Sequence, residues 1–311
     1  MLQKQVIELF DILDDPAASG DRVADYLRRC DPEARITQKT LTGSQGHTDL
    51  IRVLIPGTRG KTVGGDAPTL GILGRLGGLG ARPERIGFVS DGDGALCALA
   101  AAAKLLDMHR RGDRLPGDVV VCTHICPDAP TRPHDPVPFM GSPLKIHEIN
   151  REEVHGDLDG ILCVDTTKGN RVINHRGFAI SPTVRAGWIL RVSEDLLDIM
   201  QTVTGRLPVV FPLTTQDITP YGNDVYHLNS ILQPSTATPV PVVGVAITTE
   251  TAVAGCATGA SHFSDIEEAA RFLVEASKAY GAGACRLSDD AEFARLLQLY
   301  GSMEHLQTLG K

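Results

Sequence analysis

The sequence predicts an α/β protein, a three-layer sandwich with a mostly parallel central sheet. Two patterns carry this prediction. Segments that are apolar throughout, such as DVVVCT at residues 118–123 and GILCV at residues 160–164, are typical of strands buried on both faces. They alternate with amphipathic or alanine-rich segments of helical period, the order found in α/β proteins. With 311 residues and no internal repeat or linker, residues 1–311 are expected to form a single α/β domain.

The first third of the chain predicts two helices and then two strands. QKQVIELFDIL at residues 3–13 places its apolar side chains mostly on one helical face. Ser19 or Asp21 can cap a second helix, whose apolar stripe includes Val23 and Leu27. DLIRVLIP at residues 49–56 and the apolar run at 68–73 are expected to be strands.

The remaining elements follow from the same periodicities. Residues 95–110 form an alanine-rich helix suited to burial between a sheet and other helices. Ser264 followed by Glu267 predicts a capping box at the start of an amphipathic helix over 264–280. Further strands are expected at residues 85–89, 118–123, 160–164, 207–213 and 240–247, and further helices at 185–203, 224–232 and 289–299.

Composition excludes some functional classes. The chain has 30 Lys+Arg against 38 Asp+Glu, a formal charge of −8, and only 5% aromatic residues, which argues against a nucleic-acid-binding protein. The sequence shows no signal-peptide pattern and no apolar run near the ~18 residues that a membrane helix needs. We therefore expect no membrane association and a cytoplasmic location. Seven cysteines, an odd and scattered set, are expected to be reduced thiols, and the spacing of Cys122 and Cys126 is only a weak zinc signal.

A proline-rich loop follows the strand at 118–123. This loop spans residues 127–145. The segment CPDAPTRPHDPVPFMGSP, which begins at the cysteine before the loop, contains six prolines. Proline disfavours regular structure, and a loop of this length is often functional.

Candidate site residues lie where predicted strands end. Asp91, Asp128 and Asp165 each follow a predicted strand, and His124 and Cys126 lie just before Asp128. In open parallel sheets, ligands bind beyond the carboxyl ends of the strands. Carboxylates that crowd together there need a cation, and with a histidine they suit zinc or another first-row divalent ion. The alternative is that each acid only caps the next helix or turn.

Other candidates are less specific. Arg75, in the turn GRLG, is expected to bind a substrate carboxylate or to be a solvated turn residue. Asp224 either lines a pocket or caps the next helix, and Glu250 is either an extra ligand or a solvated loop acid. His262 precedes the helix at 264–280 as a ligand, cap or surface residue. The glycine-rich segment GTRGKTVGG at 57–65 lacks the spacing of a nucleotide-binding phosphate loop.

The order of segments resembles that of dinuclear zinc aminopeptidases and carboxypeptidases. DILDDPAASGDRVADYLRR (11–29) resembles their opening helix, turn and helix, and SDGDGALCALAAAAKLL (90–106) resembles their bridging-aspartate loop and helix. GDVVVCTHICPDAP (117–130) is similar to the strand ending in D-E-E, and ILCVDTT (161–167) to the strand carrying another acidic ligand. GNDVYHL (222–228) resembles a glycine-rich loop near their substrate. The whole sequence also resembles domain-of-unknown-function family 1177.

The resemblance implies a zinc-peptidase-like fold with a degenerate metal site. It assigns Asp91 as bridging ligand, with Asp128 and Asp165 as further ligands. The family's metal-binding histidine aligns with Arg75, its catalytic glutamate with Pro127, and its last histidine ligand near Glu250.

Two functions follow from the sequence. The first is a metal-dependent hydrolase of a small amide, lactam or peptide-like substrate. A divalent metal, zinc by analogy, would be held by Asp91, Asp128 and Asp165 with Glu250, and His124 would act as base. Arg75, Asp224 and His262 would then contact the substrate. The alternative is a non-catalytic protein that binds a small anion without metal. By analogy of fold class, a homo-oligomer is expected.

Overall fold

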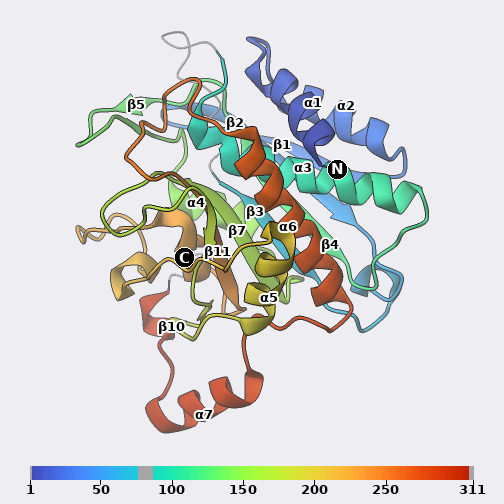
Figure 1. Cartoon of the computed structure of the whole chain (residues 1–311), viewed down its shortest axis with the longest axis vertical. Helices are drawn as coiled ribbons and strands as arrows, with labels where there is room; N and C mark the ends of the chain where they lie inside the picture. Colours follow the sequence, from blue (N-terminus) through green and yellow to red (C-terminus); the bar gives the residue numbers. More distant parts are fainter. Residues whose placement is uncertain (1, 76–86, 308–311) are drawn as a thin grey trace.

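A nine-stranded mixed sheet forms the centre of the molecule (Figure 1). The computed structural model describes residues 2–75 and 87–307. The strand order is β1-β2-β4-β3-β7-β11-β9-β10, with β8 pairing with β11 off this path. Two short strands, β5 (Thr131–Arg132) and β6 (Phe139–Met140), form a separate hairpin in the proline-rich loop.

The four central strands are parallel, which confirms the predicted core of the sheet. They are β4 (Val119–Ile125), β3 (Leu70–Gly74), β7 (Gly160–Thr167) and β11 (Val242–Thr248). Because all four run in the same direction, the residues that follow them lie along one edge of the sheet. The candidate site residues near strand ends are therefore brought to the same side of the molecule.

Antiparallel strands complete both edges of the sheet. On one side lie β1 (Arg35–Gly43), which the sequence did not predict, and β2 (Gly46–Ile55). On the other lie β8 (Gly177–Ile180), β9 (Val184–Arg185) and β10 (Trp188–Ile189). Hairpin strands are stable at an edge because the neighbouring strand satisfies their backbone groups.

Helices cover the sheet on both faces, as the predicted three-layer sandwich requires (Figure 1). One face is packed by α1 (Gln3–Asp14), α2 (Gly20–Cys30), α3 (Asp93–Arg110), α5 (Glu194–Thr204) and α6 (Phe263–Gly281). The opposite face is covered by α4 (Ile146–Glu153) and by the 3₁₀ segments η3 (Thr215–Ile218) and η4 (Ser230–Thr236). Successive strand residues alternate between two apolar cores, with Ile72 in the first and Leu73 in the second.

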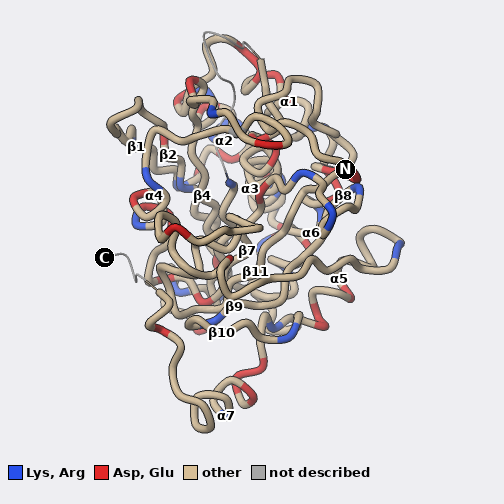
Figure 2. Tube along the Cα trace, turned by 90° about the vertical axis from the view of Figure 1, so that its left-hand side faces the viewer, with Lys and Arg blue, Asp and Glu red and all other residues tan. Residues whose placement is uncertain are grey.

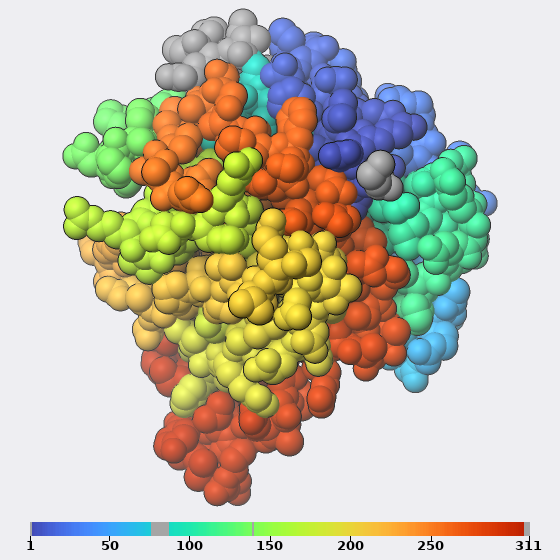
Figure 3. Space-filling model, in the orientation of Figure 1, coloured from blue at the N-terminus to red at the C-terminus, as the bar shows by residue number. Residues whose placement is uncertain are grey.

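The last helix, α7 (Asp290–Tyr300), projects from the lower end of the molecule, as Figure 3 shows. Three short 3₁₀ turns complete the described structure: η1 (Lys61–Val63), η2 (Ser90–Gly92) and η5 (Glu304–Leu306).

Small residues bring α3 close to the sheet. A Cβ atom added at Gly74 of β3 would lie 2.7 Å from the Cβ of Ala98. One added at Gly94 would lie 1.9 Å from the carbonyl oxygen of Arg75. Only glycine permits such close backbone contact. The first turn of α3 is therefore packed directly against the ends of β3 and β7.

Three predicted elements were wrong. Residues 185–203 contain a hairpin before α5, because Ala186 and Gly187 adopt positive φ angles of 46° and 79°, as in tight hairpin turns. Residues 207–213 form only one bridge, Ile180 to Val210, since the two prolines of LPVVFPL cannot donate hydrogen bonds. In place of a helix over 224–232, the chain forms η4 further along.

Two further predictions differ in detail. The helix α6 begins at Phe263, so the N-cap position belongs to His262 and the predicted Ser264 capping box is absent. The strand predicted at residues 85–89 falls partly outside the described residues, as does the turn after Arg75. Within its described part, Val89 forms a single bridge with Thr258.

The glycine-rich segment at 57–65 surrounds the side-chain carboxylate of Asp118. Asp118 accepts hydrogen bonds from the backbone amides of Gly57 and Thr62, at 2.7 and 2.9 Å, and from the Thr62 hydroxyl at 2.7 Å. A Cβ at Gly60 would lie 1.9 Å from the Asp118 carboxylate. The carboxylate thus fills the space that a phosphate would need.

Charge, cysteines and helix lengths agree with the compositional expectations. Figure 2 shows Lys and Arg interspersed with Asp and Glu, without an extended basic stripe on the visible trace. All seven cysteines are free thiols. Among the described residues, no helix is long and apolar enough to cross a membrane.

Candidate functional site

The candidate site lies at the carboxyl ends of β3 and β7. These strands pair in register from Leu70 with Gly160 to Gly74 with Val164. The backbone amide of Arg75 continues the ladder by donating to the Val164 carbonyl oxygen at 2.7 Å. Arg75 and Asp165 are therefore placed next to each other although they are far apart in sequence.

Of the three aspartates predicted to converge, Asp91 and Asp165 lie close enough to interact, whereas Asp128 is exposed. The Thr166 hydroxyl donates to the carbonyl oxygen of Ser90 at 2.8 Å and ties the end of β7 to η2. Burial and the nearby Asp91 charge raise the pKa of Asp165 to about 7. Burial also raises the pKa of Asp91 to about 6, although the Lys168 ammonium opposes this shift. The two carboxylates therefore form an acidic pair that is costly to ionise without a nearby cation.

Asp93 and Lys168 extend this cluster, and the sequence analysis missed both. Asp93 begins α3, is almost fully buried, and lies 3.4 Å from the Lys168 ammonium. It also accepts a hydrogen bond from the Ser261 hydroxyl. Burial raises the pKa of Asp93 to about 7 despite these partners. The repeated acids in SDGDG were the available sequence signal, but only the fold shows that Asp93 points inward.

A buried ion pair involving Arg75 forms the other half of the site. An Arg75 nitrogen, Nη2, lies 2.7 Å from Oε2 of Glu153 and donates to Oδ1 of Asn150 at 2.6 Å. His124 contacts the other Glu153 oxygen at 3.2 Å. Burial favours the neutral form of Glu153, but the Arg75 charge and the hydrogen bond with His124 outweigh it and hold the pKa of Glu153 below its usual value. No sequence pattern singled out Glu153 or Asn150, because α4 is an ordinary short amphipathic helix.

Taken together, the charges do not balance. Within residues 2–75 and 87–307, four largely buried carboxylates, Asp91, Asp93, Asp165 and Glu153, lie around two largely buried cations, Arg75 and Lys168. Burial is the main cause of the raised pKa values of the three aspartates, and the Asp91 charge adds to the shifts of Asp93 and Asp165.

A cavity of about 770 Å³ opens beside Arg75 and Asp165. Its other walls come from the proline-rich loop around Met140–Lys145, from the start of α4 including His147, and from Tyr221. Burial and the Asp165 charge raise the pKa of Tyr221 to about 12, so its hydroxyl stays protonated. Two Arg75 nitrogens, Nε and Nη1, are buried and have no hydrogen-bond partner among the residues that the structure describes. This is a concave site with both polar and apolar walls, of the size that small ligands occupy.

Four predicted site residues lie outside this cluster. Asp128, Asp224, Glu250 and His262 are all exposed. Asp224 adopts a positive φ of 61° at the tip of a turn, and His262 lies at the N-cap of α6 without a side-chain capping bond. His124 is buried and bonds Glu153, but it does not line the cavity. Across the part of the chain that the structure describes, no group of three or more His, Cys, Asp or Glu side chains is arranged to hold a metal ion.

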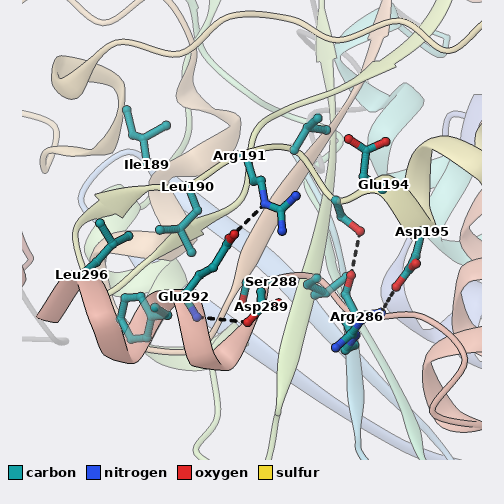
Figure 4. A pocket seen from close by; sticks show the side chains of 14 residues that line it. Ile189, Leu190, Arg191, Glu194, Asp195, Arg286, Ser288, Asp289, Glu292 and Leu296 are labelled. Atoms are coloured by element: carbon teal, nitrogen blue, oxygen red, sulfur yellow. Dashed lines mark hydrogen bonds and ion pairs between the residues drawn. The ribbon is translucent and has the colours of Figure 1, made fainter. Parts of the chain in front are cut away.

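A second groove, beneath α7, offers less chemistry (Figure 4). Its volume is about 400 Å³. Arg191 pairs with Glu292 at 3.0 Å, and the backbone amide of Arg286 donates to Asp195 at 2.8 Å. The first contact fastens α7 to the body of the protein, so we assign the groove a structural role.

Comparison with known proteins identifies the family. A family model described as "Protein of unknown function (DUF1177)" matches residues 39–310. The chain belongs to this family. No curated protein matches it in sequence.

Two solved structures share the fold of this DUF1177 protein. One is "Bottromycin maturation enzyme BotP in complex with Mn", with a TM-score of 0.52 and 13% identity over 88% of this chain and 70% of that chain. The other is the glutaminyl cyclase of an Acidobacteriales bacterium, with a TM-score of 0.51 and 12% identity over 91% of this chain and 94% of that chain. The similarity confirms the metallopeptidase-like fold.

Proposed function

We propose that this protein is a metal-dependent hydrolase that acts on a small amide, lactam or peptide-like substrate bound in the 770 Å³ cavity. The observation that carries the proposal is the excess of buried carboxylate over buried cation around Asp91 and Asp165. A divalent ion would neutralise this excess. Two solved structures of the same fold are enzymes by title, one of them bound to manganese, which agrees with the proposal.

The donor chemistry favours a hard ion. Asp91 and Asp165 offer only carboxylate oxygens, and the sulfur and nitrogen ligands that zinc prefers do not join them in a group of three among the described residues. Magnesium and manganese are commonly held by one or two carboxylates, with water and substrate completing the shell. We therefore propose Mn²⁺ or Mg²⁺ in place of the zinc expected from the sequence. When bound, such an ion polarises a carbonyl group and makes water more acidic.

The protein's own residues have separate roles in this proposal. The free Nε and Nη1 donors of Arg75 bind a substrate carboxylate, and Glu153 and Asn150 hold the guanidinium in place. The protonated hydroxyl of Tyr221 donates a hydrogen bond to the substrate.

We assign the general base to His147 rather than to His124, because His147 lines the cavity and His124 lies behind Glu153. Asp224 and His262, both exposed, remain candidates for peripheral substrate contacts.

Metal analysis tests the proposal. Protein purified without added metal or chelator is expected to contain near-stoichiometric divalent ion by elemental mass spectrometry. Asp91→Asn and Asp165→Asn should abolish it, while the exposed residues Asp128 and Glu250 should be replaceable by Asn and Gln without loss. If Asp128→Asn also removed the ion, Asp128 would be a metal ligand, as the sequence analysis expected. Metal-free wild-type protein that also fails to bind Mn²⁺ in calorimetry would overturn the proposal.

One observation favours the second function, an anion-binding protein without metal. Arg75 and Lys168 already supply cations at the site, and each is engaged by a carboxylate. In that case small carboxylates would bind to protein treated with EDTA, and Arg75→Met would abolish this binding without any effect of Mn²⁺. Hydrolysis of a panel of dipeptides and aminoacyl anilides, dependent on Mn²⁺ and lost in His147→Gln, would support the enzyme instead.

The cytoplasmic location and the homo-oligomer stay predictions, which cell fractionation and light scattering test.

A further inference from the structure

Another cavity, of about 450 Å³, lies at the opposite end of α3 from the candidate site. The candidate site contacts Asp93 at the first turn of this helix, whereas His109 in its last turn lines the second cavity. With 18 residues, α3 separates the two by about 27 Å at 1.5 Å per residue. The other wall, Gly57 and Thr58, follows β2, whose Ile55 pairs with the first residue of β4 at the amino edge of the parallel strands. The two cavities are therefore distinct.

A buried carboxylate–imidazole pair faces this cavity. Nδ1 of His109 lies 2.7 Å from Oδ2 of Asp31, and the two residues are only 7% and 2% exposed. The other Asp31 oxygen accepts the Glu33 amide at 3.0 Å, which fixes the carboxylate. Nε2 of His109 forms no hydrogen bond with any described residue. The contact between Nδ1 and Asp31 holds the imidazole ring at the wall of the cavity.

Two arginines lie at the rim of the same cavity. Arg35 and Arg114 both line it, are exposed, and form no ion pair within residues 2–75 and 87–307. The Thr58 side chain also lines the cavity, and Glu33 is the single carboxylate on its surface. On the lining of the cavity, the two guanidinium groups outweigh the Glu33 carboxylate. This local surplus of positive charge occurs in a chain whose net charge is −8.

We propose that this cavity binds a compact oxyanion, a phosphate or carboxylate group, between Arg35 and Arg114 and beside the His109 ring. Planar guanidinium groups match such anions with paired hydrogen bonds. The neighbouring glycine-rich segment contributes shape rather than charge, because its amides are occupied by Asp118. This site is independent of the proposed hydrolase activity.

Titration with inorganic phosphate, and separately with malonate, tests the proposal in EDTA-treated full-length protein. Histidine-ring NMR signals provide the readout, because the His109 ring should shift saturably while the signal of His147 in the other cavity should not. The probe that binds more tightly identifies the preferred anion. Replacing both Arg35 and Arg114 by Gln should weaken binding roughly tenfold or more, as expected for lost charge-assisted hydrogen bonds.

Arg295→Gln is the matched control, because Arg295 is exposed on α7 and contacts Gln298 instead of the cavity. It should leave both titrations unchanged. The double variant removes only exposed side chains, so its fold is expected to be intact, and circular dichroism checks this. The absence of a saturable His109 shift with either probe, or equal affinities in the double variant and the wild type, would overturn the proposal.

Discussion

Replacing Glu153 by glutamine should destabilise the protein strongly. Glu153 is fully buried and is paired with Arg75 at 2.7 Å and with His124 at 3.2 Å. The variant keeps the side-chain size but removes the carboxylate that forms the ion pair with the buried Arg75 charge. Removing one partner of a buried pair typically costs about 3–5 kcal/mol, a large part of the ~5–15 kcal/mol that stabilises most domains.

The adjacent residue provides the control. Glu152 pairs with Lys39 at 2.7 Å, but both side chains are solvent-accessible, at 29% and 53%. Glu152→Gln removes a surface ion pair, which is worth about 0–1 kcal/mol. Urea unfolding followed by circular dichroism gives both free energies, and similar slopes would show that the two transitions are comparable.

The pH dependence gives a second criterion. Because the pKa of Glu153 is lowered in the folded protein, its contribution is present above the pKa of unfolded glutamate and is lost as the pH falls. The difference between wild type and Glu153→Gln should therefore shrink on acidification. Equal unfolding free energies for Glu152→Gln and Glu153→Gln at neutral pH would refute the assigned role of the buried pair.

Three further predictions follow from the structure. In EDTA, the free energy of unfolding of the wild type should fall as the pH rises from about 4 to 7, because the raised pKa of Asp165 stabilises the folded state only while Asp165 is protonated. In denaturant titrations, Asp165→Asn should reduce this pH-dependent loss of stability by roughly 4 kcal/mol. Asp118→Asn weakens charge-assisted bonds to the glycine-rich segment and should lower the unfolding free energy by about 1.5–3 kcal/mol in urea titrations. Gly255→Ala would place a Cβ 2.2 Å from the Asp91 carboxylate and should weaken Mn²⁺ binding measured by calorimetry, whereas Gly156→Ala, with no atom within 4 Å, should not.

The central strands and most helices could be predicted from sequence because their signals are local. Fully apolar runs and helical periodicity depend only on neighbours along the chain, and β4, β7, β11, α3 and α6 all follow them. The edge strands were harder. The strand β1 alternates exposed and half-buried residues and is paired only with β2, so its sequence lacks the apolar run that marks a central strand.

The sequence by itself determined that Asp165 lies near the end of a central strand, and it predicted that Asp91 and Asp128 would lie nearby. Asp91 does so from η2, after a single antiparallel bridge at Val89. Only the tertiary structure decided how deeply these carboxylates are buried and which charged groups surround them. Arg75 forms an ion pair with Glu153, which lies 78 positions further along the chain. Asp118 accepts a hydrogen bond from Gly57, which is 61 residues away in the sequence. Burial and long-range electrostatics depend on which surfaces meet after folding, and no local pattern encodes them. For the same reason, the sequence could not show that Asp128 and Glu250, which were equally good candidates for metal ligands, are exposed to solvent.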